Sequence, residues 1–341
     1  MSDARGETLD VLEAAGAALA RDGRVTIATI IDTWGSSPVP VGGQMLITSD
    51  GTFQGSVSGG CVEGEVIAEA LELLEEPGAP RVLTYGVADE TAWRVGLPCG
   101  GQIRILVERL DGERGKALLD RLAAARKARE ALLVVTNLSS GGKRVYARTD
   151  TGLPATIAAR FHSARSSVED EAGGEVFVHA VVPPPRVLVI GATHIGQILC
   201  EQVRLTGFEA IVIDPRSAFA ASARFGDTRM IVEWPQDALP RLGLDAYTAV
   251  AALAHVGHID DEALKLALRA DCFYVGALGS KRNHSKRVER LAAAGLSEAE
   301  IARTKAPIGI DLGATTPAEI GLSIMAEIVR SLRGPSGKGA S

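Results

Sequence analysis

The chain has 341 residues, of which 46% are hydrophobic and 23% are charged. This is the usage of an ordinary globular protein, which excludes disordered and fibrous classes, and the length suggests about two domains. The 36 basic and 42 acidic residues give a net charge of −6, so no basic excess indicates nucleic-acid binding.

No apolar run approaches the roughly 18 residues that a membrane span requires, and the charged N-terminus lacks the hydrophobic segment of a secretory signal. The four cysteines show no Cys-x-x-Cys spacing, which excludes a zinc ribbon and indicates reduced thiols. They are Cys61, Cys99, Cys200 and Cys272. We therefore expect a cytoplasmic protein that contacts neither nucleic acid nor membrane.

Helical and strand patterns mix in the first part of the chain, which predicts an α+β domain over residues 1–182. Apolar residues at helical spacing predict helices over 9–19 and 62–74, and a third helix is expected over 113–129. Apolar runs bounded by turn residues predict strands. These cover residues 25–31, 44–48, 81–85, 102–108, 132–136, 144–148 and 176–182.

Three consecutive prolines at 183–185 mark a boundary, because proline is excluded from helix interiors and central strands. Beyond them, buried strands alternate with helical segments, which predicts a Rossmann-like, doubly wound parallel sheet over residues 183–334. The expected strands cover 186–190, 210–214, 230–232, 248–253 and 273–278.

The last helix is signalled by a capping box in which Thr316 is the N-cap, Pro317 follows, and Glu319 stands three residues later. Residues 335–341 are expected to form a flexible tail.

The first candidate site is a loop of glycines and serines just before the helix predicted at 62–74. Backbone N–H groups and hydroxyls at a helix N-terminus can bind an anion, and Cys61 there should have a lowered thiol pKa. Alternatively, the loop is a tight turn in which Cys61 packs as a small hydrophobic residue. The candidate ligands are Ser56, Ser58, Gly59, Gly60, Cys61 and Glu63.

A second loop carries Cys99 followed by Gly100 and Gly101, immediately before a predicted strand. By itself it reads as a plain turn. If the fold brings the two loops together, Cys61 and Cys99 become soft sulfur ligands suited to a transition metal or to sulfur transfer.

The turn after the strand at 186–190 has a dinucleotide-binding pattern. Gly191 and Gly196 match the first and third glycines of GxGxxG, and Asp214 closes the next strand, where an acidic residue would hold a ribose hydroxyl. His194 lies within the turn. Thr193 replaces the middle glycine, so NAD binding is left open.

One further pattern follows the strand predicted at 248–253. His255, His258, Asp260 and Asp261 could be metal ligands or acid–base groups, or Asp260 could cap a helix over 262–269.

The end of the strand predicted at 273–278 is rich in glycine and is followed by basic residues. These residues would suit a phosphate, or they form only a solvated helical face. The candidates are Gly279, Ser280, Arg282, His284, Lys286 and Arg287, with Asp311 of a later loop expected nearby.

Together these residues resemble the XdhC/CoxI family of xanthine dehydrogenase accessory proteins. The matching runs are Gly55-Ser-Val-Ser-Gly-Gly-Cys-Val-Glu63, Pro98-Cys-Gly-Gly101, Gly191-Ala-Thr-His-Ile-Gly196, Gly279-Ser-Lys-Arg-Asn-His284 and Ala306-Pro-Ile-Gly-Ile-Asp-Leu-Gly-Ala314. The family reads Gly-Ala-Gly-His where this chain has Thr193.

The resemblance implies an accessory chaperone, rather than a stand-alone enzyme, that binds the molybdenum cofactor. The cofactor is molybdopterin or its cytosine dinucleotide, delivered in sulfurated form to an apo molybdenum hydroxylase of the xanthine dehydrogenase type. A cysteine desulfurase is the second implied partner.

In this interpretation Cys61 and Cys99 face the molybdenum. The Rossmann side, with Gly191, His194, Gly196, Asp214, Arg282 and His284, would hold the phosphate or nucleotide end. A homodimer is expected only because two-fold assemblies are common.

Two other classes stay open: an NAD(P)-linked oxidoreductase that uses the Rossmann turn, and a scaffold that binds both partners without a small molecule.

Overall fold

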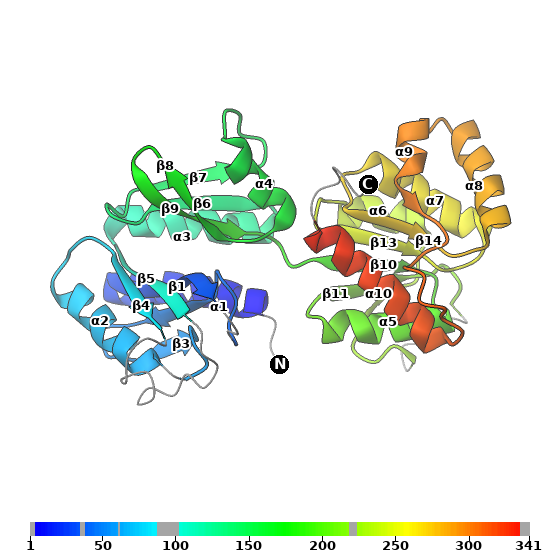
Figure 1. Cartoon of the computed structure of the whole chain (residues 1–341). Coiled ribbons are helices and arrows are strands. Elements are labelled where there is room, and N and C mark those ends of the chain that lie inside the picture. The colour runs from blue at the N-terminus through cyan, green and yellow to red at the C-terminus, as the bar shows by residue number, and fades with distance from the viewer. Residues whose placement is uncertain (1–3, 35–37, 61, 87–101, 218–223, 335–341) are drawn as a thin grey trace. The chain divides into compact units, whose positions relative to one another are not determined.

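The structure is a computed structural model. It describes residues 4–34, 38–60, 62–86, 102–217 and 224–334. The chain divides into two compact units, Met1–Pro183 and Pro184–Ser341 (Figure 1). Within the described residues, no helix is both long and apolar enough to cross a membrane.

The N-terminal unit begins with a five-stranded sheet in which every neighbouring pair is antiparallel. Its strands are β1 (Arg24–Trp34), β2 (Gln44–Ile47), β3 (Phe53–Gly55), β4 (Arg81–Tyr85) and β5 (Gln102–Asp111), in the order β3-β2-β1-β5-β4. Three helices accompany it: α1 (Ala4–Asp22), α2 (Glu63–Glu75) and α3 (Gly112–Lys127).

Strand β1 is buried without interruption from Val25 to Ile31 because both of its faces are covered. Ala28 and Ile30 pack in one core with Val66 of α2, whereas Val25 and Ile27 pack on the opposite face with α1 and α3. Alternate residues of a strand point to opposite faces, so burial on both sides removes the usual polar alternation.

A second antiparallel sheet completes this unit, in the order β7-β6-β9-β8. Its elements are β6 (Leu132–Asn137), β7 (Lys143–Ala147), α4 (Ala155–Ser163), β8 (Ser167–Glu171) and β9 (Gly174–Val181). The sequence patterns did not predict β3, α4 and β8. Strand β8, which reads Ser-Val-Glu-Asp-Glu, lies at the edge of its sheet, where polar side chains are tolerated and no apolar pattern marks the strand.

The C-terminal unit contains a six-stranded parallel sheet in the order β12-β11-β10-β13-β14-β15. The strands are β10 (Arg186–Ile190), β11 (Glu209–Ile213), β12 (Arg229–Ile231), β13 (Thr248–Ala252), β14 (Tyr274–Ala277) and β15 (Thr304–Lys305). The helices are α5 (His194–Leu205), α6 (Pro235–Leu242), α7 (Gly257–Arg269), α8 (Lys281–Ala293), α9 (Glu298–Ala302) and α10 (Pro317–Arg333).

Helices cover both faces of this sheet (Figure 1). Leu199 of α5 and Ile324 of α10 pack on one face, and Ala263 of α7 and Leu291 of α8 on the other. The predicted α+β unit and doubly wound Rossmann-like sheet are therefore confirmed, as is the capping box of Thr316 and Glu319.

Two helices begin earlier than the sequence predicts. Helix α5 starts at His194 instead of residue 197, with Thr193 as its N-cap. Helix α7 starts at Gly257 instead of residue 262, so Asp260 lies inside its first turn and does not cap it. Both starts bring the helix N-terminus closer to the carboxyl end of the preceding strand, where Rossmann folds place their ligands.

Candidate functional site

The glycine–serine loop before α2 is organised around its own carboxylate. Glu63, the first residue of α2, is only 9% exposed. Its Oε1 accepts hydrogen bonds from the Ser56 hydroxyl at 2.7 Å and the Ser58 amide at 2.9 Å, and its Oε2 from the Gly60 amide at 2.9 Å and from the Ser58 hydroxyl.

Two further amides of the described part of this loop also have internal partners. The Gly59 amide donates to Ser56 Oγ at 2.9 Å, and the Val62 amide to Ser58 Oγ at 3.0 Å. We expected these amides and hydroxyls to be offered to an external anion. Glu63 takes that place, so the loop is an anion nest occupied by a side chain of the protein.

The pKa of Glu63 reflects this environment. Burial by itself would raise it, but the hydroxyls of Ser58 and Ser56 and the Ser58 amide outweigh burial and lower the pKa to about 2. Glu63 is thus ionised throughout the neutral range and positions the loop that runs up to residue 61.

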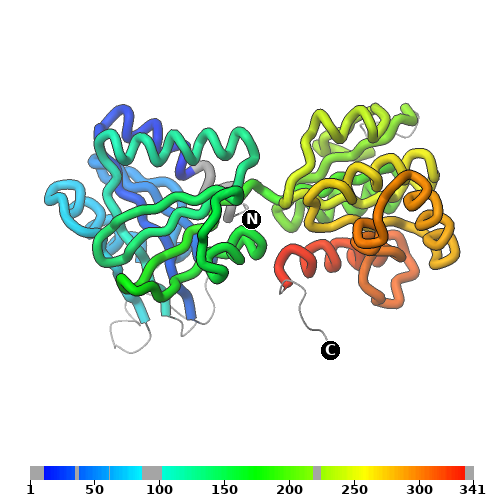
Figure 2. Tube along the Cα trace, turned by 90° about the horizontal axis from the view of Figure 1, so that it is seen from above, coloured from blue at the N-terminus to red at the C-terminus, as the bar shows by residue number. Residues whose placement is uncertain are grey.

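Cys61, Cys99, Gly100 and Gly101 lie outside the described residues. Their described neighbours can be placed. Trp34 pairs with Gln102, Tyr85 with Ile103, and Gly55 with Met45. The end of β1, the end of β4 and the start of β5 therefore lie side by side at one end of the sheet (Figure 2). The glycine–serine loop leaves β3 toward the same end.

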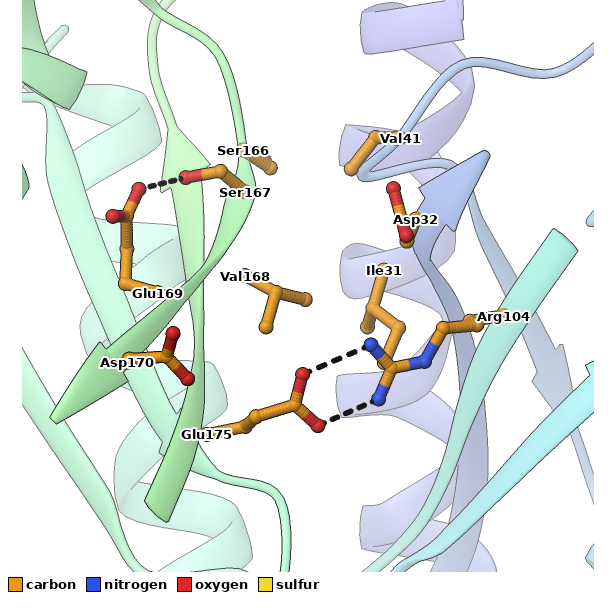
Figure 3. A pocket seen from close by; sticks show the side chains of 10 residues that line it. All are labelled: Ile31, Asp32, Val41, Arg104, Ser166, Ser167, Val168, Glu169, Asp170 and Glu175. Atoms are coloured by element: carbon orange, nitrogen blue, oxygen red, sulfur yellow. Dashed lines mark hydrogen bonds and ion pairs between the residues drawn. The ribbon is translucent and has the colours of Figure 1, made fainter. Parts of the chain in front are cut away.

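A pocket of about 340 Å³ lies between the two sheets of the N-terminal unit (Figure 3). Arg104 of β5 reaches across to Glu175 of β9 and donates to both of its carboxylate oxygens, at 3.1 and 2.8 Å. On the β8 side, Ser167 donates to Glu169 at 2.7 Å. The lining residues are Ile31, Asp32, Val41, Arg104, Ser166, Ser167, Val168, Glu169, Asp170 and Glu175.

Four carboxylates against one guanidinium make this pocket acidic, so it would repel a phosphate. It also lacks the grouping of a metal centre, because the described residues hold no cluster of three or more His, Cys, Asp or Glu able to bind a metal ion. No sequence pattern pointed to these residues. They come from five separated segments, and no short motif links them.

In the C-terminal unit, the turn after β10 is constrained as a dinucleotide-type turn would be. Gly191 has φ +106°, and a Cβ there would lie 2.5 Å from the backbone of Ala254. A Cβ on Gly196 would lie 2.7 Å from the Gly191 carbonyl oxygen. Thr193 replaces the middle glycine because its hydroxyl caps α5, accepting from the Gly196 amide at 3.1 Å.

Asp214, expected to hold a ribose, is fully buried and its carboxylate is already engaged. Oδ2 accepts from the Ala192 amide at 2.7 Å and from Arg216 Nη2 at 2.8 Å, and Oδ1 from the Arg216 amide and Nε, both at 2.9 Å. Burial would raise the pKa of Asp214, but these bonds from Arg216 and Ala192 lower it. The carboxylate supports the turn, which argues against both a ribose role and the NAD(P) alternative.

The other predicted C-terminal residues follow the same edge of the sheet. Ser280 caps α8 by accepting from the Asn283 amide at 3.3 Å, and Gly279 before it has φ +139°. Asp311 accepts from the Gly313 amide at 3.2 Å and so fixes its own loop. His194 and Arg282 are exposed, and their role as phosphate ligands stays a prediction.

His284 is half-buried, and its Nδ1 has no hydrogen-bond partner among the described residues. Burial, together with the charge of Arg287, lowers its pKa.

Among the described residues, the histidines at 255 and 258 belong to no group of three or more potential metal ligands. His255 is exposed with φ +58°, and His258 packs against Trp234 with 5.8 Å between ring centroids. The two described cysteines, Cys200 and Cys272, are buried, and burial raises each thiol pKa to about 12, so both are unreactive.

Comparison with known proteins finds two family models and several relatives that match this chain. The model of the XdhC Rossmann domain matches residues 187–328, and that of the XdhC and CoxI family matches residues 18–86. "Molybdenum cofactor insertion chaperone PaoD" of Escherichia coli (strain K12) is 28% identical over 305 residues, covering 89% of this chain and 81% of its own length.

A protein of Bacillus subtilis (strain 168), named as a probable xanthine dehydrogenase subunit, is 25% identical over 315 residues, covering 89% of this chain and 92% of its own. A crystal structure described as a xanthine dehydrogenase from Bacillus halodurans matches with a TM-score of 0.65 and 26% identity, covering 98% of this chain and 97% of that one. The two family models together cover more than half of the sequence, and the chain belongs to the XdhC and CoxI family.

Proposed function

We propose that this protein binds the molybdenum cofactor and helps to insert it into a hydroxylase of the xanthine dehydrogenase type. Family membership and a relative named as a molybdenum cofactor insertion chaperone support this role. The observation that carries it is the loop in which Glu63 holds Ser56, Ser58 and Gly60 in place beside Cys61.

The space around this loop suits a bound group. Gly60 has φ +114° and is exposed, and a Cβ built on it would meet no atom of the described residues within 4 Å. A ligand can therefore approach the backbone directly beside residue 61. Cysteine thiolates are soft donors that suit a transition metal, so we assign Cys61 and Cys99 to the molybdenum end of the cofactor. When bound, the cofactor supplies the metal and its dithiolene.

The described residues that flank the two segments support a shared site, because they point toward one end of the first sheet. The segment 87–101 leaves from Gly86 and returns at Gln102, at the end of the sheet where the loop of Glu63 begins. We therefore propose that Cys61 and Cys99 act at one site. The loop amides described above donate to Glu63 or to the serine hydroxyls, so the phosphate of the cofactor is assigned to residues outside this loop.

The test is to isolate the protein anaerobically from a molybdate-fed host and to quantify bound molybdenum and the oxidised pterin. Wild type should carry both, and Cys61→Ser and Cys99→Ser should each remove most of the molybdenum. Cys272→Ala is the matched control, because this buried thiol should have no effect. Absence of metal and pterin, under conditions that load a known molybdoenzyme, would overturn the proposal.

We further propose that the cofactor is delivered in sulfurated form, with a cysteine desulfurase supplying the sulfur. The support is chemical, since thiols that bind a metal are also suited to sulfur transfer. Apo-hydroxylase should gain activity from the loaded protein only when desulfurase and cysteine are present. If the protein captures both partners but transfers no cofactor, it is a scaffold and this proposal fails.

A further inference from the structure

The C-terminal unit contains a second pocket, of about 190 Å³, that the proposed function does not use. It lies where β13 and β14 end, between the first turn of α7 and the N-terminal half of α8. Its lining is polar and consists of His255, Gly257, Asp260, Asn283, Lys286, Arg287 and Arg290.

Arg287 is the main donor in this pocket. It is 5% exposed, and its Nη2 donates to the Leu278 carbonyl at 3.0 Å. Its Nε lies 3.7 Å from Asp261 Oδ1, which is an ion pair without a hydrogen bond. Neither Nε nor Nη1 finds a hydrogen-bond acceptor among the described residues. Unsatisfied donors on a buried guanidinium are costly, so a ligand oxygen at this position would stabilise the site.

Asp260 provides an acceptor in the same pocket. It is 1% exposed, and Oδ1 accepts from the Ala254 amide at 3.1 Å. Oδ2 receives no hydrogen bond from any residue that the structure describes. Burial raises the pKa of Asp260 to about 6, which leaves the carboxylate mostly ionised at neutral pH. The matching ligand group is therefore a hydroxyl or N–H donor.

The remaining charges make the pocket positive. Arg290 is committed to Asp261, with distances of 2.5 and 3.1 Å. Lys286 is exposed and forms no ion pair with the described part of the chain. Lys286 and Arg287 thus face a single unpaired carboxylate, that of Asp260. An anion with an adjoining hydroxyl would fit this pocket, because the anion would accept from Lys286 and Arg287 and the hydroxyl would donate to Asp260.

We propose that this pocket binds the ribose phosphate part of a nucleotide. The phosphate oxygens accept from Arg287 and Lys286, with Asn283 at the rim, and a sugar hydroxyl donates to Asp260. The pocket, of about 190 Å³, has room for a phosphate with neighbouring sugar hydroxyls, and the described residues that line it include no apolar side chain and no Phe, Tyr or Trp ring for a base to stack on. This site uses neither the glycine turn nor Asp214, and it does not depend on the molybdenum proposal.

Isothermal titration of the full-length protein tests this with four probes: CMP, ribose 5-phosphate, inorganic phosphate and cytidine. CMP and ribose 5-phosphate should bind with similar affinity, inorganic phosphate more weakly, and cytidine not at all. Lys286→Ala should raise Kd for CMP about tenfold, the equivalent of one charge-assisted hydrogen bond. Lys305→Ala removes an exposed lysine of the same unit outside the pocket and should change nothing.

Asp260→Asn is the second variant, because it retains an oxygen for the Ala254 amide and replaces the free carboxylate oxygen with a donor. It should weaken ribose 5-phosphate relative to inorganic phosphate. Binding of cytidine as tightly as CMP, absence of binding by both phosphate esters, or equal losses in Lys286→Ala and Lys305→Ala would each overturn the proposal.

A free nucleotide and the nucleotide end of a larger cofactor share this chemistry. Repeating the CMP titration on protein from molybdate-fed and cofactor-deficient hosts separates them. Loss of CMP binding only in the cofactor-loaded protein identifies the cofactor as the source, and equal binding identifies a free nucleotide. Both results require the ribose phosphate site and so support it.

Discussion

The carboxylate of Glu63 accepts hydrogen bonds from both the hydroxyl and the amide of Ser58, five residues earlier in the chain. Together with Ser56 and Gly60, this closes the loop before α2 around an internal negative charge. The glycines of the loop therefore allow the backbone to wrap a side chain of the protein itself. Cys61 is the next residue in the sequence after Gly60.

Replacing this carboxylate should loosen the loop. Glu63→Gln retains the size of the side chain but replaces one acceptor oxygen by a donor that faces other donors. We expect the free energy of unfolding to fall by about 2 kcal/mol, as for lost hydrogen bonds to a buried charged group. Urea denaturation measures it.

Glu65→Gln is the matched control for this substitution. Glu65 stands two residues later on the same helix and is exposed, so its change should stay within about 0.5 kcal/mol. Equal effects of the two substitutions would show that the loop is not held by Glu63.

The contribution of Glu63 should depend on pH in a defined direction. Its pKa in the folded protein, about 2, lies below the ordinary value of 4.5 because hydrogen bonds from Ser58 and Ser56 outweigh its burial. A carboxyl whose pKa is lowered by folding stabilises the protein above its unfolded pKa and loses that contribution as the pH falls. The stability difference between wild type and Glu63→Gln should be full at neutral pH and shrink below about 4.5.

Urea unfolding of both proteins at a series of pH values between neutral and about 3 measures this difference. A difference that grows as the pH falls would contradict the assignment.

Gly191 should tolerate no side chain. Gly191→Ala places a Cβ 2.5 Å from the Ala254 backbone at φ +106°, so we expect a loss of about 3 kcal/mol from strain and collision together. Gly295→Ala is the control, because φ is +84° there but no atom of the described residues lies within 4 Å of the added Cβ. It should cost only about 1 kcal/mol. Thermal unfolding that ranks the two variants in the reverse order would reject the close approach of Gly191 to Ala254.

Thr193 should behave as a helix cap. Thr193→Ala removes the acceptor of the Gly196 amide and should cost about 1 kcal/mol, whereas Thr193→Gly should cost a few tenths. His194→Ala, at the next and exposed position, is the control and should be nearly neutral. Chemical denaturation in which His194→Ala costs as much as Thr193→Ala would remove the capping role.

Local patterns in the sequence were sufficient for much of the fold. The strand predicted at 186–190 is β10 itself, and the capping box of Thr316 and Glu319 begins α10 as expected. Such signals arise between residues three or four apart or from the burial of a single strand, so they can be read without knowledge of the neighbours. Where a strand has no apolar pattern, as in β8, the same reasoning fails.

The sequence by itself therefore determined the fold class, the family resemblance and which loops carry glycine and cysteine. Only the tertiary structure decided what the charged groups do. Asp214 bonds to Ala192, 22 residues earlier, and Arg290 bonds to Asp261, 29 residues earlier, because strand order brings distant segments to one sheet edge. A carboxylate whose oxygens already accept hydrogen bonds from such a partner is less available to a ligand, whereas Oδ2 of Asp260 accepts none from the described residues. No local pattern in the sequence distinguishes these two cases.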